Sequence, residues 1–201
     1  RLEKLDFEEF KEKNKLNSKP IIAVLPGSRK QEIAKKLPIM LDALSIYDDY
    51  QIIIAGAPSL DTSFYNEFLI ENSKIIFGQT YNLLSHATAG VVTSGTATLE
   101  TALFNVPEVV CYKSSKFSYE IAKRLIKIKF ISLVNLIMDK EVVKELIQDD
   151  CSPAKIRQEM NKILNDKSYN DQMHNSYDEL VKKLGSGGAS KKVAQSLLKT
   201  I

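Results

Sequence analysis

Short apolar runs alternate with longer amphipathic segments along most of this sequence. Five such runs, and a weaker sixth, span residues 21–25, 51–55, 74–77, 90–93, 108–112 and 130–133. Their apolar residues are consecutive and do not alternate with polar ones, which is typical of strands covered on both faces. The segments between them have helical spacing, as Leu37, Leu41 and Leu44 illustrate. Strand, helix and strand in repetition predict right-handed crossovers and a parallel sheet.

The same patterns divide the chain into three parts. Residues 18–150 are expected to form a doubly wound α/β domain with a Rossmann-like parallel sheet. Residues 1–17 are charged and helix-prone, so we expect a linker or an edge helix there. Ser152 and Pro153 predict a helix start, with serine as the cap and proline at the first helical position. Residues 151–201 are therefore expected to form a C-terminal helical extension.

Composition narrows the functional classes. At 44% hydrophobic and 26% charged residues the chain is in the ordinary globular range, and no apolar run approaches the roughly 20 residues that span a bilayer. The net charge of +3 is too small to favour a nucleic-acid partner. Cys111 and Cys151 are far apart in sequence, which suits a reducing cytoplasm, and neither a metal nor a cofactor is expected. The first methionine is Met40, and we interpret the chain as part of a longer protein.

The first segment with candidate chemistry is Leu25-Pro26-Gly27-Ser28-Arg29, directly after the first predicted strand. Gly27 allows a tight turn and a close approach to a ligand. Ser28 and Gln31 have the spacing of a capping box. A cation such as Arg29 opposes the helix dipole in a first turn, and a bound phosphate would remove that conflict. Alternatively, Arg29 points into solvent or pairs with Glu32.

The second such segment is Ser94-Gly95-Thr96-Ala97-Thr98-Leu99-Glu100, which follows the fourth predicted strand. Its small and hydroxyl residues leave backbone N–H groups available at a helix start. Glu100 could accept both hydroxyls of a ribose, or it could simply favour the positive end of the helix dipole. The motifs G-x-G-x-x-G and G-x-x-x-x-G-K-[ST] do not occur, which argues against a nicotinamide enzyme and a P-loop NTPase.

In their order along the chain, these segments resemble lipid-A-disaccharide synthases. The likeness extends from Ile21 to about Ile163, and each motif alone is modest. Their common order makes the resemblance specific. The segments that carry it are 25–29 with Glu32, 94–100, 107–112, 122–125, 132–136, 145–148 and 151–153.

The resemblance implies a GT-B glycosyltransferase, in which two Rossmann-like halves enclose the active site. Such an enzyme joins UDP-2,3-diacylglucosamine to 2,3-diacylglucosamine 1-phosphate, forming the β-1,6-linked disaccharide of lipid A and releasing UDP. This chain would be the C-terminal half, which holds most of the UDP, and its partner would be the N-terminal domain. The implied location is the cytoplasmic face of the bacterial inner membrane. The oligomeric state, including a homodimer, stays open.

The resemblance also implies the residues of the donor site. Arg29 would contact the diphosphate, residues 94–96 the phosphates, and Glu100 the ribose. Asn135 would line the donor pocket, although the sequence around it also fits a turn or cap residue. No catalytic residue is expected in this chain, because the family's general base lies in the N-terminal half. The UDP-binding residues implied are Gly27, Ser28, Arg29, Ser94, Gly95, Thr96, Glu100 and Asn135.

Residues 113–130 combine several lysines and an arginine with apolar residues at helical spacing. A basic amphipathic helix can lie on an anionic bilayer, which suits an enzyme with acylated substrates. Lys123, Arg124 and Lys127 are therefore candidate membrane contacts. The alternative is an ordinary helix that packs on the core and exposes its basic side to solvent.

Two other functions remain compatible with the sequence. One is another GT-B enzyme, such as a UDP-GlcNAc epimerase or the undecaprenyl-linked muramyl transferase. The motifs after Pro107 count against these enzymes. The other is a nucleotide-binding module without turnover, which we expect this chain to be in the absence of the N-terminal half.

Overall fold

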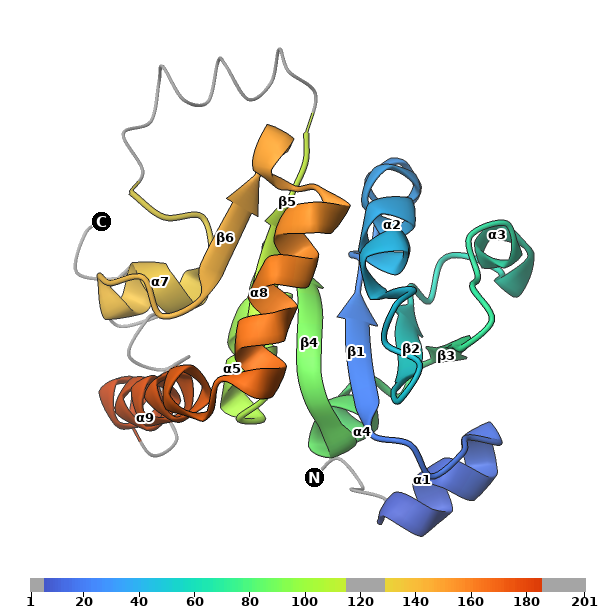
Figure 1. Ribbon diagram of the computed structural model, residues 1–201, viewed down its shortest axis with the longest axis horizontal. Helices are drawn as coiled ribbons and strands as arrows, with labels where there is room; N and C mark the ends of the chain where they lie inside the picture. Colours follow the sequence, from blue (N-terminus) through green and yellow to red (C-terminus); the bar gives the residue numbers. More distant parts are fainter. Residues whose placement is uncertain (1–5, 115–128, 186–201) are drawn as a thin grey trace, which may run out of the picture.

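The structure is a computed structural model that describes residues 6–114 and 129–185 (Figure 1). Its helices and strands alternate along most of the chain. The helices are α1 (Phe7–Asn14), α2 (Lys30–Leu44), α3 (Thr62–Asn66), α4 (Thr80–His86), α5 (Thr96–Leu103), α7 (Leu133–Met138), η1 (Gln148–Asp150), α8 (Pro153–Asn165) and α9 (Lys167–Leu184). The strands are β1 (Ile21–Leu25), β2 (Gln51–Gly56), β3 (Ser73–Phe77), β4 (Ala87–Thr93), β5 (Glu108–Tyr112) and β6 (Lys144–Ile147).

The strands form one sheet in the order β3-β2-β1-β4-β5-β6. Every pair is parallel, as the consecutive apolar runs predict. The chain moves outward from β1 to β3, then returns to the other side of β1 and continues to β6. This order is that of a doubly wound Rossmann-like sheet, and it places the topological switch point between β1 and β4.

Five of the six predicted strands are confirmed, and the sixth is wrong. Residues 130–133 are not a strand, because Ser132 caps α7 and its hydroxyl accepts a hydrogen bond from the backbone N–H of Asn135. The sixth strand is β6, which pairs with β5 at the edge of the sheet. Its four residues include Lys144 and Glu145, so it lacks the apolar run that marks the central strands.

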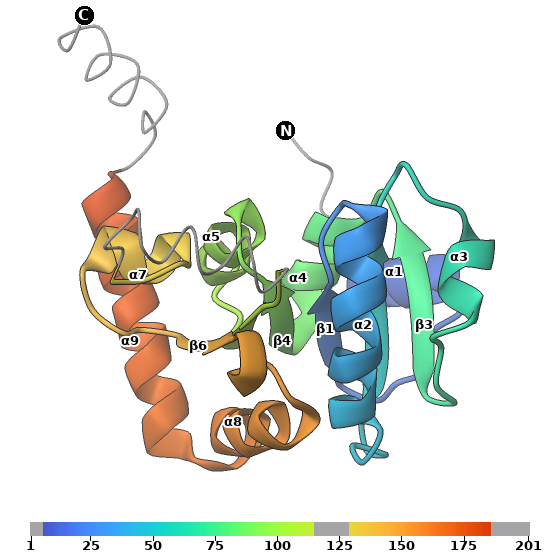
Figure 2. The same ribbon diagram turned by 90° about the horizontal axis from the view of Figure 1, so that it is seen from above.

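Both faces of the sheet are buried. Along β1, Ile22 and Val24 face one hydrophobic cluster, while Ile21 and Ala23 face the other. Helices α2 and α8 pack against each other over the first face, and α4 covers part of the opposite face (Figures 1 and 2). Burying each isoleucine or valine side chain contributes on the order of 1.5–3 kcal/mol. This burial holds the strand ends, and the turns that follow them, in place.

The segments flanking the predicted α/β domain also contribute to this core. Phe10 of α1 is buried in one cluster, and Met160 of α8 and Tyr177 of α9 are buried in the other. Helix α8 begins at Pro153 with Ser152 as its cap residue, as predicted. Across the described ranges 6–114 and 129–185, no helix combines the length and apolarity that crossing a membrane requires.

Candidate functional site

Two turns line one cavity at the carboxyl ends of β1 and β4, beside the switch point of the sheet. The cavity has a volume of about 280 Å³. Parallel sheets of this type bind ligands at this position. Six of the eight predicted UDP-binding residues line it: Gly27, Ser28, Ser94, Gly95, Thr96 and Glu100.

The first turn depends on Gly27, whose φ of +109° suits glycine far better than other residues. A Cβ atom at this position would lie 3.2 Å from Cγ2 of Thr93. The predicted capping box of Ser28 and Gln31 is wrong. Helix α2 begins at Lys30 with Arg29 as its N-cap residue, and no side chain of the described residues caps it. Ser28 is exposed and lines the cavity.

Arg29 does not line this cavity. Its side chain is 81% exposed, and its Nη1 lies 3.1 Å from Oε1 of Glu32, which is the alternative that the sequence left open. Arg29 instead lines an adjacent cavity of about 540 Å³. Glu32 and Ser94 line both cavities, so the two spaces share a wall. Arg29 would have to swing away from Glu32 to reach a ligand in the first cavity.

The second turn depends on Gly95, with φ of +140° and ψ of −158°. Only glycine adopts this conformation readily. Gly95 is also the N-cap residue of α5, and no side chain in the described ranges caps this helix. Thr98 in its first turn donates its N–H to the carbonyl oxygen of Gly95 at 3.3 Å. Within residues 6–114 and 129–185, the N–H groups of Thr96 and Ala97 have no acceptor and are available to an anion. The hydroxyl of Ser94 is already used, because it donates to the carbonyl oxygen of Ile131 at 2.9 Å.

Glu100 lies on the first turn-and-a-half of α5 and is partly buried at the cavity. Among residues 6–114 and 129–185, no hydrogen-bond or ion-pair partner engages its carboxylate. A carboxylate in this position can accept hydrogen bonds from a pair of neighbouring hydroxyl groups. The cavity is therefore lined both by N–H donors and by a carboxylate acceptor.

Lys36 is a charged residue near the site that the sequence analysis missed. Its side chain is only 4% exposed, and its Nζ donates to Oγ1 of Thr93 and lies 3.9 Å from Oε2 of Glu32. Burial lowers the pKa of this ammonium, while the charge of Glu32 opposes the shift. Lys36 follows Ile33 by three positions and precedes Leu37, on the buried side of α2. A lysine on an apolar face was the signal that could have revealed it.

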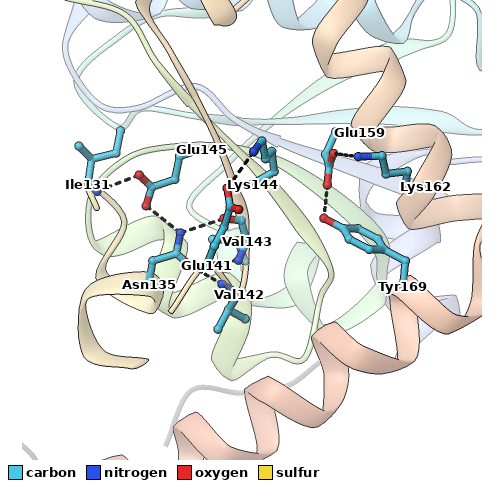
Figure 3. Close-up of polar contacts among 10 residues, drawn as sticks. All are labelled: Ile131, Asn135, Glu141, Val142, Val143, Lys144, Glu145, Glu159, Lys162 and Tyr169. Carbon is cyan, nitrogen blue, oxygen red and sulfur yellow. Dashed lines mark hydrogen bonds and ion pairs between the residues drawn. The ribbon is translucent and has the colours of Figure 1, made fainter. Parts of the chain in front are cut away.

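Asn135 is not at the cavity, contrary to the prediction. It is fully buried in α7, and both its amide groups are used within the protein (Figure 3). Its Oδ1 accepts from the backbone N–H groups of Val142 and Val143 at 2.7 and 3.0 Å. Its Nδ2 donates to the carbonyl of Val143 at 2.8 Å and to Oε1 of Glu145 at 2.9 Å. Both the oxygen and the NH₂ group of the Asn135 side chain are therefore occupied by contacts between α7 and residues 142–145, and Asn135 is not among the residues that line the cavity.

Other predicted features lie elsewhere. The candidate membrane contacts Lys123, Arg124 and Lys127 fall outside the described residues. Within the described ranges, no group of three acidic, histidine or cysteine side chains could hold a metal ion.

Cys111 and Cys151 are both free and buried and, although distant in sequence, lie close together. Their hydrogen bond and burial raise the pKa of the Cys111 thiol well above its usual value.

Comparison with known proteins supports the family suggested by the sequence. The family model for lipid-A-disaccharide synthetase matches residues 2–200. The chain is 37% identical over 188 residues to the lipid-A-disaccharide synthase of Syntrophus aciditrophicus, covering 90% of this chain and 49% of that protein. It is 36% identical over 181 residues to the enzyme of Coxiella burnetii, with 88% and 48% coverage. The chain thus spans about half the length of the curated relatives it matches.

Solved structures share the fold. The calicheamicin glycosyltransferase CalG4 aligns with a TM-score of 0.60 and 19% identity, over 89% of this chain and 42% of CalG4. S. aureus MnaA, in a co-structure with UDP, aligns with a TM-score of 0.64 and 15% identity, over 98% of this chain and 52% of MnaA. The α/β fold is that of one half of a GT-B glycosyltransferase. The chain belongs to the lipid-A-disaccharide synthetase family.

Proposed function

We propose that this chain holds the UDP moiety of the sugar donor in a lipid-A-disaccharide synthase. The observation that carries the proposal is the meeting of two turns, with their uncapped helix N-termini, and one carboxylate at a single cavity. The N–H groups of residues 95–97 would bind the diphosphate, and Glu100 would bind the ribose hydroxyls. Arg29 would leave Glu32 and pair with the diphosphate, because a doubly charged phosphate group is the stronger partner.

The proposed reaction is a direct displacement at the anomeric carbon of UDP-2,3-diacylglucosamine. The 6-hydroxyl oxygen of 2,3-diacylglucosamine 1-phosphate forms the new bond to this carbon, and the bond to the β-phosphate oxygen breaks. The hydroxyl proton passes to a general base that we expect in the N-terminal half of the enzyme. The departing UDP takes the electron pair of the broken bond, and the helix N-termini and Arg29 stabilise its negative charge.

The test is turnover by the complete protein, with the N-terminal half present. We expect UDP and the tetraacylated disaccharide 1-phosphate in equal amounts, as measured by mass spectrometry. Glu100→Ala should lower kcat/KM about tenfold or more, because a hydrogen-bonded charged acceptor is lost. Absence of the disaccharide, with the wild-type protein folded and both substrates supplied, would overturn the proposed reaction.

An epimerase is the second candidate, since the fold also matches a protein described as a putative UDP-N-acetylglucosamine 2-epimerase from Listeria monocytogenes, with a TM-score of 0.54 and 13% identity. The two candidates differ in their products. An epimerase would change the configuration of UDP-N-acetylglucosamine without any acylated acceptor. We expect no such change, and its detection by NMR of the sugar would favour the epimerase.

We also propose contact with the cytoplasmic face of the inner membrane, on sequence grounds alone. The basic residues Lys123, Arg124 and Lys127 support this proposal. Sedimentation with anionic vesicles should weaken with added salt and with charge reversal at Lys123 and Arg124. Unchanged sedimentation of the charge-reversal variant would remove this part of the proposal.

A further inference from the structure

A hydrogen-bonded network outside the cavity ties the second turn to distant parts of the chain. Ser94, which lines the cavity, donates its hydroxyl hydrogen to the carbonyl oxygen of Ile131. The N–H of Ile131 in turn donates to Oε2 of Glu145 at 2.9 Å (Figure 3). Glu145 belongs to β6 and is not part of the cavity wall. A single residue, Ile131, therefore connects the turn to a carboxylate that a ligand in the cavity would not touch.

The carboxylate of Glu145 accepts three hydrogen bonds. Besides the N–H of Ile131, it accepts the N–H of Ser132 and the Nδ2 of Asn135, both at 2.9 Å. Asn135 is itself fixed by its bonds to Val142 and Val143. An ionised carboxylate offers only acceptors, and its hydrogen bonds are stronger than those of neutral groups. Glu145 therefore holds the N–H groups on both sides of the Ile131 carbonyl and so constrains this backbone segment.

We infer that Glu145 is a positioning residue for the UDP site. It fixes the Ile131 carbonyl, which orients the Ser94 hydroxyl and with it the backbone of residues 94–96. The free N–H groups that follow Ser94 then face the cavity in a fixed arrangement, as a preorganised anion site requires. This inference rests on the proposed function, since UDP is the ligand whose binding it concerns.

Glu159 provides a matched control. It is also a carboxylate engaged in hydrogen bonds, of which it accepts two, and its side chain is only 4% exposed, so it is more deeply buried than that of Glu145 (Figure 3). Its partners are Lys162, at 3.0 Å, and the hydroxyl of Tyr169. The contact with Tyr169 joins α8 to α9, the contact with Lys162 lies within α8, and in the described part of the chain neither involves Ser94. Replacing Glu159 tests the loss of a buried carboxylate without disturbing the second turn.

The substitution Glu145→Gln keeps the size of the side chain but replaces one acceptor oxygen with an NH₂ group. That group cannot accept from a backbone N–H, so either Ile131 or Ser132 loses its partner. Calorimetry with UDP should give a Kd about tenfold higher for Glu145→Gln than for the wild-type chain, as loss of one charge-assisted hydrogen bond predicts. For Glu159→Gln the Kd should stay within about twofold of the wild-type value. Equal effects of the two substitutions would overturn the inference.

Ser94→Ala removes the link between the network and the turn. In this background, Glu145→Gln should change the Kd by less than about twofold, because the two residues act through the same contact. If the fold-changes in Kd of the two single variants multiply in the double variant, Glu145 does not act through Ser94.

A ligand-free measurement separates this inference from the proposed function. In NMR spectra of the chain without UDP, the amide signals of residues 94–96 should shift in Glu145→Gln and stay in place in Glu159→Gln. Unmoved signals in Glu145→Gln would overturn the positioning role even if UDP binds. Shifted signals without any UDP binding would instead contradict the proposed function.

Discussion

The two turns at the cavity are alike in composition but are held in different ways. The side chains at the turn of Gly27 come mainly from residues nearby in sequence: Arg29 pairs with Glu32, and Lys36, which also donates to Thr93 of β4, lies close to Gly27. The turn at Gly95 is supported from a distance, because Ser94 bonds to Cys111 through its N–H and to Ile131 through its hydroxyl. Contacts between residues that are close in sequence can be predicted from a sequence pattern. Contacts between residues that are far apart in sequence are known only once the fold is known.

This difference has a functional consequence. A turn held by exposed side chains, such as the pair of Arg29 and Glu32, can rearrange when a ligand arrives, since such pairs contribute little free energy. A turn held by buried or partly buried hydrogen bonds resists rearrangement. We therefore expect the first turn to adapt to the diphosphate and the second to present a preformed set of N–H groups.

The largest effect is expected from Gly27→Ala. Alanine is strained at the positive φ of this position, and its Cβ would lie close to Thr93. Together these effects should lower the free energy of unfolding by roughly 2–3 kcal/mol, measured by urea denaturation. Gly95→Ala is the matched variant, because a positive φ would also strain alanine there, but no atom of the described residues other than its chain neighbours lies within 4 Å of the added Cβ. It should cost less than Gly27→Ala. A larger loss in Gly95→Ala would contradict the view that crowding adds to strain only at the first turn.

Removal of side-chain support should affect the two turns unequally. Ser94→Ala should lower the free energy of unfolding by about 1 kcal/mol, since a part-buried hydrogen bond is lost. Arg29→Ala should change it by less than about 0.5 kcal/mol, because the ion pair is exposed. Thermal denaturation of both variants measures these changes. Equal losses of unfolding free energy would contradict the view that the two turns are held differently.

The smallest effect is a pH dependence at Lys36. Burial places its folded-state pKa below the ordinary value of 10.5, so keeping it charged costs folding free energy at neutral pH. The cost disappears as the pH rises through the folded-state pKa toward 10.5. Lys36→Met should therefore raise stability relative to the wild-type chain at pH 7, and the gain should shrink as the pH approaches 10.5.

Lys35→Met is the control for this prediction. Lys35 is exposed on the same helix, so its replacement changes the net charge equally without removing a buried ammonium. Urea denaturation at several pH values should show no comparable trend for Lys35→Met. The same pH trend in both variants would mean that general charge repulsion, and not burial, determines the cost.

The sequence predicted what depends on local pattern. The five apolar runs became strands, and the turns after the first and fourth strands meet at the switch point because parallel strands align their carboxyl ends. The edge strand β6 was missed because its Lys144 and Glu145 interrupt the apolar pattern of a strand. Residues 130–133 do have such an apolar pattern, although they form no strand.

At the site, the errors concern the partners of side chains. Ser28 follows the spacing of a capping box, yet α2 begins two residues later, at Lys30. Asn135 was placed at the cavity, but its amide is fully used by segments that come together only in the fold. Spacing along the chain reports which residues can interact within a helix or turn. It does not report which distant residue supplies the partner.

The central claim is that the two turns and Glu100 form one UDP site, and calorimetric titration of the chain with UDP tests it most directly. We predict saturable binding of UDP to the wild-type chain, weakened about tenfold or more in Glu100→Ala by loss of a charged acceptor. Glu179→Ala, which removes an exposed carboxylate of α9, should bind UDP as the wild type does. Absence of saturable binding, or equal affinity in the wild type and Glu100→Ala, would contradict the claim.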